Sequence, residues 1–262
     1  MIRQPHTTPV SENMEKKRFS FLLLVLLTFL LASCGKDSFL GFAKSTGDIV
    51  TITRPVDKNF TNIYLHDDVD LVITQGPTFS IKIEGGENLL PGIETIISDS
   101  MLTISNTNTM NWIRSYDKKI TAYVTMPHLL NLQYEATSTV TNTDTLKEDS
   151  LFVTALGGSG YIKLLLNVGS SHFSIYRGSV DMDISGNVGV NYIYSNGYGP
   201  FHCLYLKTGY TFISNSSTND CYINVQNYLE YKIKNLGNIY YIGNPEIVPA
   251  SLTGQGKLIH ME

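Results

Sequence analysis

The chain has 262 residues, of which 42% are apolar and 16% are charged, and its formal net charge is -4. This length and apolar content are enough to bury one continuous core. The small negative charge, without a basic run beyond the first 18 residues, argues against a nucleic-acid-binding protein.

The N-terminal segment has the pattern of a secretory signal. Residues 1–13 show no pattern and are interpreted as lying upstream of the start at Met14. A basic stretch at 14–18 precedes an apolar run at 19–31, which is too short to be a confident membrane span. Residues 31–34, Leu-Ala-Ser-Cys, resemble the lipobox of bacterial lipoproteins. We therefore expect residues 14–33 to be removed, with an ordinary signal peptide as the alternative.

The resemblance to lipoproteins implies a lipid anchor at Cys34, where the thiol receives a diacylglycerol and the new amine a third acyl chain. Two or three chains hold a protein on a membrane durably, whereas one does not. Gly35, rather than Asp, follows Cys34, which by resemblance to enterobacterial sorting favours the outer membrane. The side of that membrane stays open. Residues 34–47 are expected to be a flexible tether.

Alternating apolar and polar residues, bounded by turn residues, predict short strands through the next hundred residues. The segment 106–119 breaks this pattern and predicts a loop, while 136–140 resemble a degenerate corner of the repeat that follows. The expected strands are 49–53, 60–65, 69–74, 79–84, 93–98, 101–105 and 120–126, with the runs 129–140 and 151–156 leading into the repeat.

A turn-and-strand unit recurs from Leu151 to Pro245. Its corners centre on Gly158, Gly178, Gly197, Ser216 and Leu236, at steps of 20, 19, 19 and 20 residues. Counting from these corners predicts three inward columns: Ala155, Ile175, Tyr194, Ile213 and Ile233; Ile162, Met182, Phe201, Cys221 and Tyr240; and Leu164, Ile184, Cys203, Ile223 and Ile242.

This repeat is too short for a propeller blade and has no helical period, so it predicts an all-β fold, a single-domain β-solenoid over residues 48–259 with rungs of 19–20 residues. Asn196, Asn215 and Asn235 are interpreted as corner residues that tolerate a left-handed backbone and bond along the stack. Cys203 and Cys221 fall in different columns, so we expect two buried thiols and no disulfide.

Several stretches resemble one known family. They are residues 68–76 (Asp-Val-Asp-Leu-Val-Ile-Thr-Gln-Gly), 81–85 (Ile-Lys-Ile-Glu-Gly), 126–129 (Met-Pro-His-Leu), the Gly-Ser-Gly-like corners, and the ending at 237–245 and 254–258. Together they resemble the auto-transporter adhesin family with a head GIN domain, over about 48–259. The corners at 215–217 and 235–237 depart from its pattern. The resemblance implies a β-solenoid lipoprotein of the bacterial envelope, with no agreed ligand.

The sequence contains no clear catalytic pattern. Asp181 and Asp183 share a strand face, but two acids without a third partner are more often the solvated side of a strand. The six histidines have no metal-ligand spacing. We therefore expect no enzyme, no metal and no cofactor, with a carbohydrate-active enzyme on the same scaffold as the alternative.

The remaining candidate is a recognition surface. Tyr176, Ile193 and Phe212 interrupt the polar face on consecutive rungs, where they could stack on sugar rings or anchor a protein. Coverage by another layer or a second subunit is the alternative interpretation. The sequence thus predicts an envelope-anchored binding protein for a glycan or a protein ligand. A structural self-assembly unit and a homo-oligomer stay open.

Overall fold

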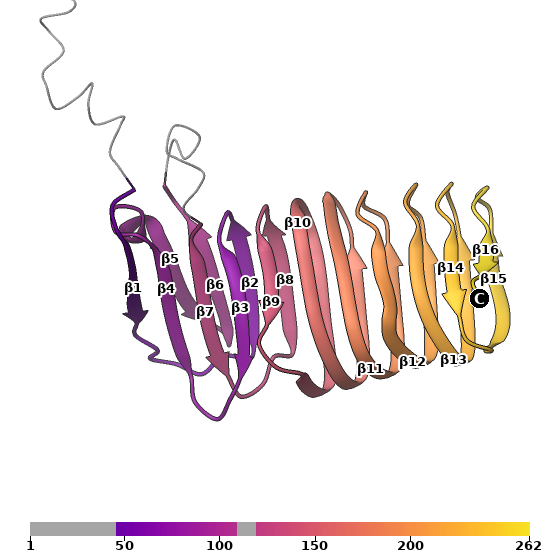
Figure 1. The fold of residues 1–262 in the computed structure, drawn as a ribbon, viewed down its shortest axis with the longest axis horizontal. Coiled ribbons are helices and arrows are strands. Elements are labelled where there is room, and N and C mark those ends of the chain that lie inside the picture. Colours follow the sequence, from indigo (N-terminus) through magenta and orange to yellow (C-terminus); the bar gives the residue numbers. More distant parts are fainter. Residues whose placement is uncertain (1–45, 109–118) are drawn as a thin grey trace, which may run out of the picture. The chain divides into compact units, whose positions relative to one another are not determined.

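The computed structural model describes residues 46–108 and 119–262, and all structural statements below concern these residues. They are 69% strand, contain no α-helix and wind into a β-solenoid of about 6 turns (Figure 1). The predicted all-β solenoid is confirmed. The signal segment, Cys34, most of the tether and most of the loop expected at 106–119 lie outside the described residues.

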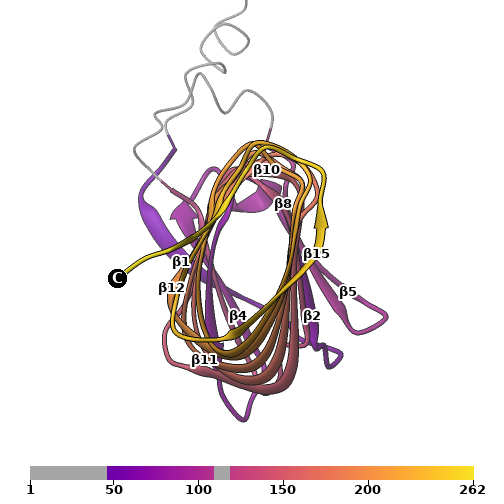
Figure 2. The same cartoon turned by 90° about the vertical axis from the view of Figure 1, so that its right-hand side faces the viewer.

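Each turn of the solenoid runs along one face, rounds a corner and returns along the opposite face, so the turns superpose as a flattened ring (Figure 2). The central turns are β10 (Leu146–Ile175), β11 (Ser179–Ser195), β12 (Phe201–Asn215) and β13 (Cys221–Ile233), which pair in parallel. We call face A the side formed by 151–155, 171–175, 191–195, 211–215 and 229–233, and face B the side formed by 160–166, 179–184, 201–206 and 221–225.

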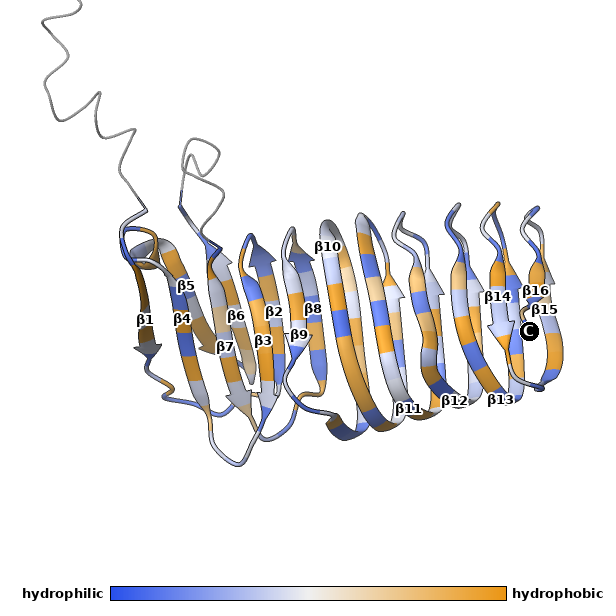
Figure 3. Cartoon of the chain, viewed as in Figure 1, coloured by the Kyte–Doolittle hydropathy of each residue, from blue (hydrophilic) through white to orange (hydrophobic). Residues whose placement is uncertain are grey.

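Alternation along each strand builds the core. Inward positions are apolar and buried, while outward positions are polar or aromatic, and Figure 3 shows the resulting change of hydropathy along the strands. Tyr134 is fully buried, and its hydroxyl is satisfied by donating to the carbonyls of Ser138 (2.6 Å) and Ser159 (3.1 Å). Cys203 and Cys221 are buried free thiols, as predicted.

The register after each corner follows the sequence prediction until the last turn. On face B, Ile162 pairs with Met182, Met182 with Phe201, and Phe201 with Cys221. The final partner of Cys221 is Ile239, so the expectation of Tyr240 is wrong by one residue, and Ile242 is likewise replaced by Tyr241 opposite Ile223.

The register before each corner differs from the prediction. Ile175 pairs with Ser195, Ser195 with Asn215, and Asn215 with Ile233, so Tyr194 and Ile213 do not belong to this column. The cause is corner length. The corner between β10 and β11 is 176–178, whereas the next corner is the longer 196–200, so a count back from the corner glycine does not carry over.

The corner asparagines bond along the stack as expected. Asn196 Nδ2 donates to the Tyr176 carbonyl (3.1 Å), and Asn235 Nδ2 donates to the Ser216 carbonyl (3.2 Å), in each case to the preceding corner. Asn215 instead points inward and is fully buried. None of the three has a positive φ among the described residues. That backbone occurs in the corner glycines Gly158 (85°) and Gly178 (81°).

The N-terminal turns are not stacked in chain order. β2 (Asn62–Asp67) lies between β6 (Met101–Asn106) and β8 (Asn131–Ala136), and β3 (Asp70–Gln75) lies between β7 (Thr121–Met126) and β9 (Thr139–Asn142), all in parallel. The corner expected within 136–140 is confirmed between β8 and β9, and Gly158 of the next turn registers with Ala136.

Antiparallel strands extend the N-terminal end of the solenoid. β4 (Ser80–Gly86) pairs with β7, β1 (Ile49–Arg54) pairs with β4, and β5 (Ile93–Ser98) pairs with β6. The guanidinium of Arg54 donates to the carbonyls of Leu90 (2.9 Å) and Ile93 (2.7 Å), at either end of the 3-10 turn Leu90–Gly92. This ties the two strands of the extension, β1 and β5, together.

The C-terminal end of the solenoid consists of three short strands. β14 (Ile239–Ile242) and β15 (Glu246–Leu252) pair with β13, and β16 (Leu258–His260) pairs with β14. Pro249 lies within β15, where the register also shifts. A proline removes a backbone donor, so proline and irregular register weaken a strand edge as a template for another strand.

Candidate binding face

Four aromatic side chains form a row on the outside of face A. His172 registers with Tyr192, and Tyr192 registers with Phe212. The ring centroids from Phe152 to His172, Tyr192 and Phe212 are 4.3, 4.5 and 5.1 Å apart, with interplanar angles of 9°, 9° and 14°. Neighbouring strands are about 4.8 Å apart, which suits parallel ring stacking. We call these four residues the aromatic row.

The three residues singled out in the sequence have different positions in the structure. Phe212 belongs to the aromatic row. Tyr176 is 48% exposed, lies at the corner and contacts Tyr194 with ring centroids 5.2 Å apart. Ile193 is only 3% exposed, so the expectation that it interrupts the outer face is wrong. A step of 20 residues before the corner, rather than 19, would have aligned 172, 192 and 212.

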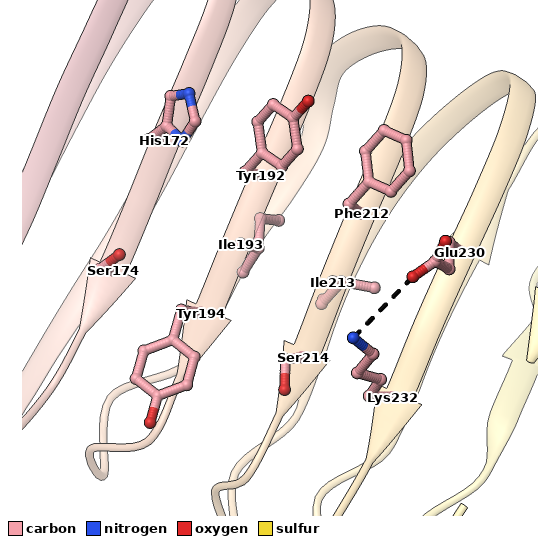
Figure 4. Close-up of a pocket in the computed structure, with 10 residues that line it drawn as sticks. All are labelled: His172, Ser174, Tyr192, Ile193, Tyr194, Phe212, Ile213, Ser214, Glu230 and Lys232. Carbon is pink, nitrogen blue, oxygen red and sulfur yellow. Dashed lines mark ion pairs between the residues drawn. The ribbon is translucent and has the colours of Figure 1, made fainter. Parts of the chain in front are cut away.

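A second outward column runs beside the aromatic row and leaves a depression between them. Ser174 registers with Tyr194, Tyr194 with Ser214, and Ser214 with Lys232, so small side chains alternate with large ones (Figure 4). The depression has a volume of about 230 Å³. It is lined by His172, Ser174, Tyr192, Ile193, Tyr194, Phe212, Ile213, Ser214, Glu230 and Lys232.

Polar groups gather at one end of the depression. Lys232 Nζ lies 4.0 Å from Glu230 Oε1, and Figure 4 shows this pair beside Phe212. Ser214 Oγ is buried and has no hydrogen-bond partner among the described residues. A buried hydroxyl without a partner costs free energy, so Ser214 Oγ is suited to bond to a ligand or water in the depression.

The depression is close to electrically neutral. Desolvation between the neighbouring rings lowers the pKa of His172 below its ordinary 6.5, so the imidazole is uncharged at pH 7. Glu230 and Lys232 offset each other. Such a surface has no excess charge with which to attract a phosphate or a carboxylate.

The residues considered for catalysis are dispersed over the molecule. Asp181 and Asp183 are partly buried strand residues of face B, and Asp183 Oδ2 lies 3.9 Å from Lys163 Nζ. Across residues 46–108 and 119–262, no three His, Cys, Asp or Glu residues are grouped so as to hold a metal ion. These aspartates therefore match the solvated strand side described from the sequence.

One histidine–carboxylate pair was not anticipated from the sequence. His128 Nδ1 lies 3.2 Å from Glu148 Oε2, beside a cavity of about 500 Å³. The Glu148 carboxylate also accepts bonds from Gln75 Nε2 (2.9 Å) and from the Leu129 N–H (3.1 Å), while the His128 side chain is 65% exposed. These bonds fix the junction between turns, so the pair has a structural role.

Taken together, the fold and the aromatic row define a single-domain β-solenoid protein with an outward binding face. In the described part of the chain, no helix is long and apolar enough to cross a membrane. Residues 59–245 match the family described as "Putative auto-transporter adhesin, head GIN domain", and the chain belongs to this family. The resemblance found in the sequence is thereby confirmed.

Solved structures share this fold. A putative adhesin from Bacteroides fragilis aligns with a TM-score of 0.75 and 21% identity over 82% of this chain and 97% of that one. A putative adhesin from Parabacteroides merdae gives 0.60 and 18% over 83% and 98%. A protein described as a putative lipid binding protein from Parabacteroides distasonis gives 0.62 and 15% over 83% and 98%. No curated protein matches the chain.

Proposed function

We propose that this chain is a non-enzymatic, lipid-anchored protein of the bacterial envelope whose face A binds a ligand in adhesion. The observation that carries the proposal is the aromatic row beside a depression on the outside of the solenoid. Phe152 is 44% exposed and Tyr192 is 39% exposed. Contiguous exposed apolar side chains mark interaction sites more often than they occur by chance.

The anchor follows from the N-terminal sequence. Cleavage before Cys34 and lipidation of its thiol would attach the mature chain to the outer membrane, with residues 34–47 as a tether. Membership of an adhesin family supports a location at the cell envelope. A tethered solenoid can turn its broad face toward a ligand, whereas a chain held in a membrane could not.

The alternative of a structural self-assembly unit requires strand edges that can pair end to end. The C-terminal edge carries Pro249 and a register shift, and β16 has only three residues. At the other end, antiparallel strands replace the parallel solenoid pairing. Both features weaken end-to-end stacking, so binding through face A is the function that the geometry favours.

The proposal is tested by protease treatment of intact cells, with the natural protein compared with Cys34→Ala. The natural protein should be found in the membrane fraction and be cleaved by external protease, because the lipid holds it on the outer surface. The variant should leave the membrane fraction because its anchor is missing. Cells with a ruptured outer membrane provide the control for protease activity.

Two results would contradict this proposal. Retention of Cys34→Ala in the membrane fraction would show that the lipid is not the anchor. Cleavage only after outer-membrane rupture would place the protein in the periplasm, and the adhesive role would then be withdrawn.

A further inference from the structure

The depression on face A offers an apolar wall made of aromatic rings. Tyr194 lies on one side of Ser214 in register, and Phe212 lies two residues before Ser214 on the same strand, where both side chains point outward (Figure 4). The aromatic row continues this wall across two earlier turns to Phe152. Aromatic surface of this kind packs well against the C–H face of a pyranose ring.

The opposite wall of the depression offers hydrogen-bonding groups that have capacity to spare. Ser214 Oγ has no partner among the described residues. Glu230 and Lys232 are partly exposed, and their only printed ion pair is the long one of 4.0 Å to each other. A carboxylate accepts at two oxygens and an ammonium donates three bonds. Adjacent hydroxyls of a sugar can therefore bond to both groups at once.

The same polar groups argue against an apolar protein side chain as the occupant. An apolar group would exclude water from Ser214 Oγ and from the Glu230–Lys232 pair without replacing the lost hydrogen bonds, which costs free energy. The offsetting charges and the neutral His172 also give no advantage to an acidic ligand. An uncharged ligand that has one apolar face and several hydroxyls satisfies all of these groups.

The size of the depression limits what it can hold. Its volume of about 230 Å³ is below the roughly 300–1,000 Å³ of pockets that enclose drug-sized ligands. It suits one ring of a larger molecule, and the remainder can extend along the aromatic row, which runs parallel to the solenoid axis.

We infer that the depression binds one hexose residue of a neutral glycan, with Tyr194 and Phe212 against the apolar face of the sugar and Ser214, Glu230 and Lys232 bonded to its hydroxyls. The inference rests on the proposed function, because it names the ligand class for the same face.

The test uses the full chain purified in detergent and a printed array of neutral and acidic oligosaccharides, followed by calorimetric titration of the neutral glycan that is retained best. Ser214→Tyr fills the depression and should lower the affinity by about tenfold or more, since a lost contact of 1.4 kcal/mol already costs that factor. Glu230→Gln keeps the shape, removes the charge and should also weaken binding.

Ser179→Tyr is the matched control because it adds the same side chain at an exposed position of face B. It should leave the affinity unchanged, and thermal unfolding should show that both tyrosine variants are folded. Loss of binding in Ser214→Tyr alone would support the inference. Equal affinities of the two variants, retention of acidic glycans in preference to neutral ones, or no retained neutral glycan would each overturn it.

The two proposals fail separately. If surface exposure depends on Cys34 but no neutral glycan binds, the envelope role stands and the sugar site falls. If glycans bind at face A but the protein stays protected in intact cells, the sugar site stands and the adhesive role falls.

Discussion

His172 is the residue of the aromatic row whose charge can change near physiological pH. It stacks between Phe152 and Tyr192, and burial lowers its pKa from 6.5. Below pH 6.5 the unfolded chain therefore takes up this proton before the folded chain does. Since stability rises with pH wherever the unfolded state binds more protons, acidification from pH 7 toward pH 5 should remove stability at this site.

We predict that His172→Phe lowers this pH dependence. The free energy of unfolding, measured by urea titration at pH 7 and pH 5, should fall less in the variant than in the natural protein, because phenylalanine keeps the stacking and has no proton to bind. His128→Phe is the control, since that ring is exposed. An equal fall in the natural protein and in His172→Phe would refute the prediction.

At the scale of the strand and corner, the corner glycines hold neighbouring turns at close approach. Gly178 has φ 81°, and an added Cβ would lie 2.2 Å from the carbonyl oxygen of Gly158 on the preceding turn. Both the backbone conformation and the space therefore require glycine there. Gly157, two residues after Ala155 on β10, has neither restriction, because an added Cβ would approach nothing closer than 3.6 Å.

Gly178→Ala should destabilise the fold by at least about 1–3 kcal/mol, the usual range for one strained backbone position. Gly157→Ala should have a much smaller effect. Chemical denaturation of both variants by circular dichroism measures the difference. Equal stabilities would mean that the corner relaxes without resistance and that the close stacking of turns does not depend on these glycines.

The same corners explain how much of the strands and of the site was predictable from the sequence. The columns after the corner were found because each strand begins directly at a recurring turn, as Met182, Phe201 and Cys221 show. The columns before the corner were not, because corners differ in length. For this reason the aromatic row was only partly found, through Phe212, and the depression beside it depends on a register that corner spacing does not specify.

At the scale of the whole molecule, the solenoid prediction was correct and the order of its first turns was not. Strand patterns identify β2 and β3, but nothing in residues 62–75 specifies that their neighbours are residues 101–106 and 121–126 on one side and 131–142 on the other. Pairing between distant segments depends on competing contacts across the whole chain rather than on local pattern.

The two ends of the solenoid should differ in local stability. β14 and β16 are short, and β15 has a register shift and mostly exposed or half-exposed side chains. Segments with few buried contacts open at lower free energy. Hydrogen exchange followed by mass spectrometry should show faster exchange in residues 239–260 than in β11 and β12. Uniform protection along the chain would contradict this gradient.

The inserted position of β2 and β3 also determines the order in which the chain can fold as it is synthesised. From β10 onward, each turn finds its neighbour about 20 residues earlier, so it can close as soon as it emerges from the ribosome. Asp67, in contrast, waits for Ala136. The first turn to be made thus has both strand edges open until its two later neighbours exist. A ribosomal pause before residue 131 would therefore prolong the period in which the nascent chain is most prone to aggregate.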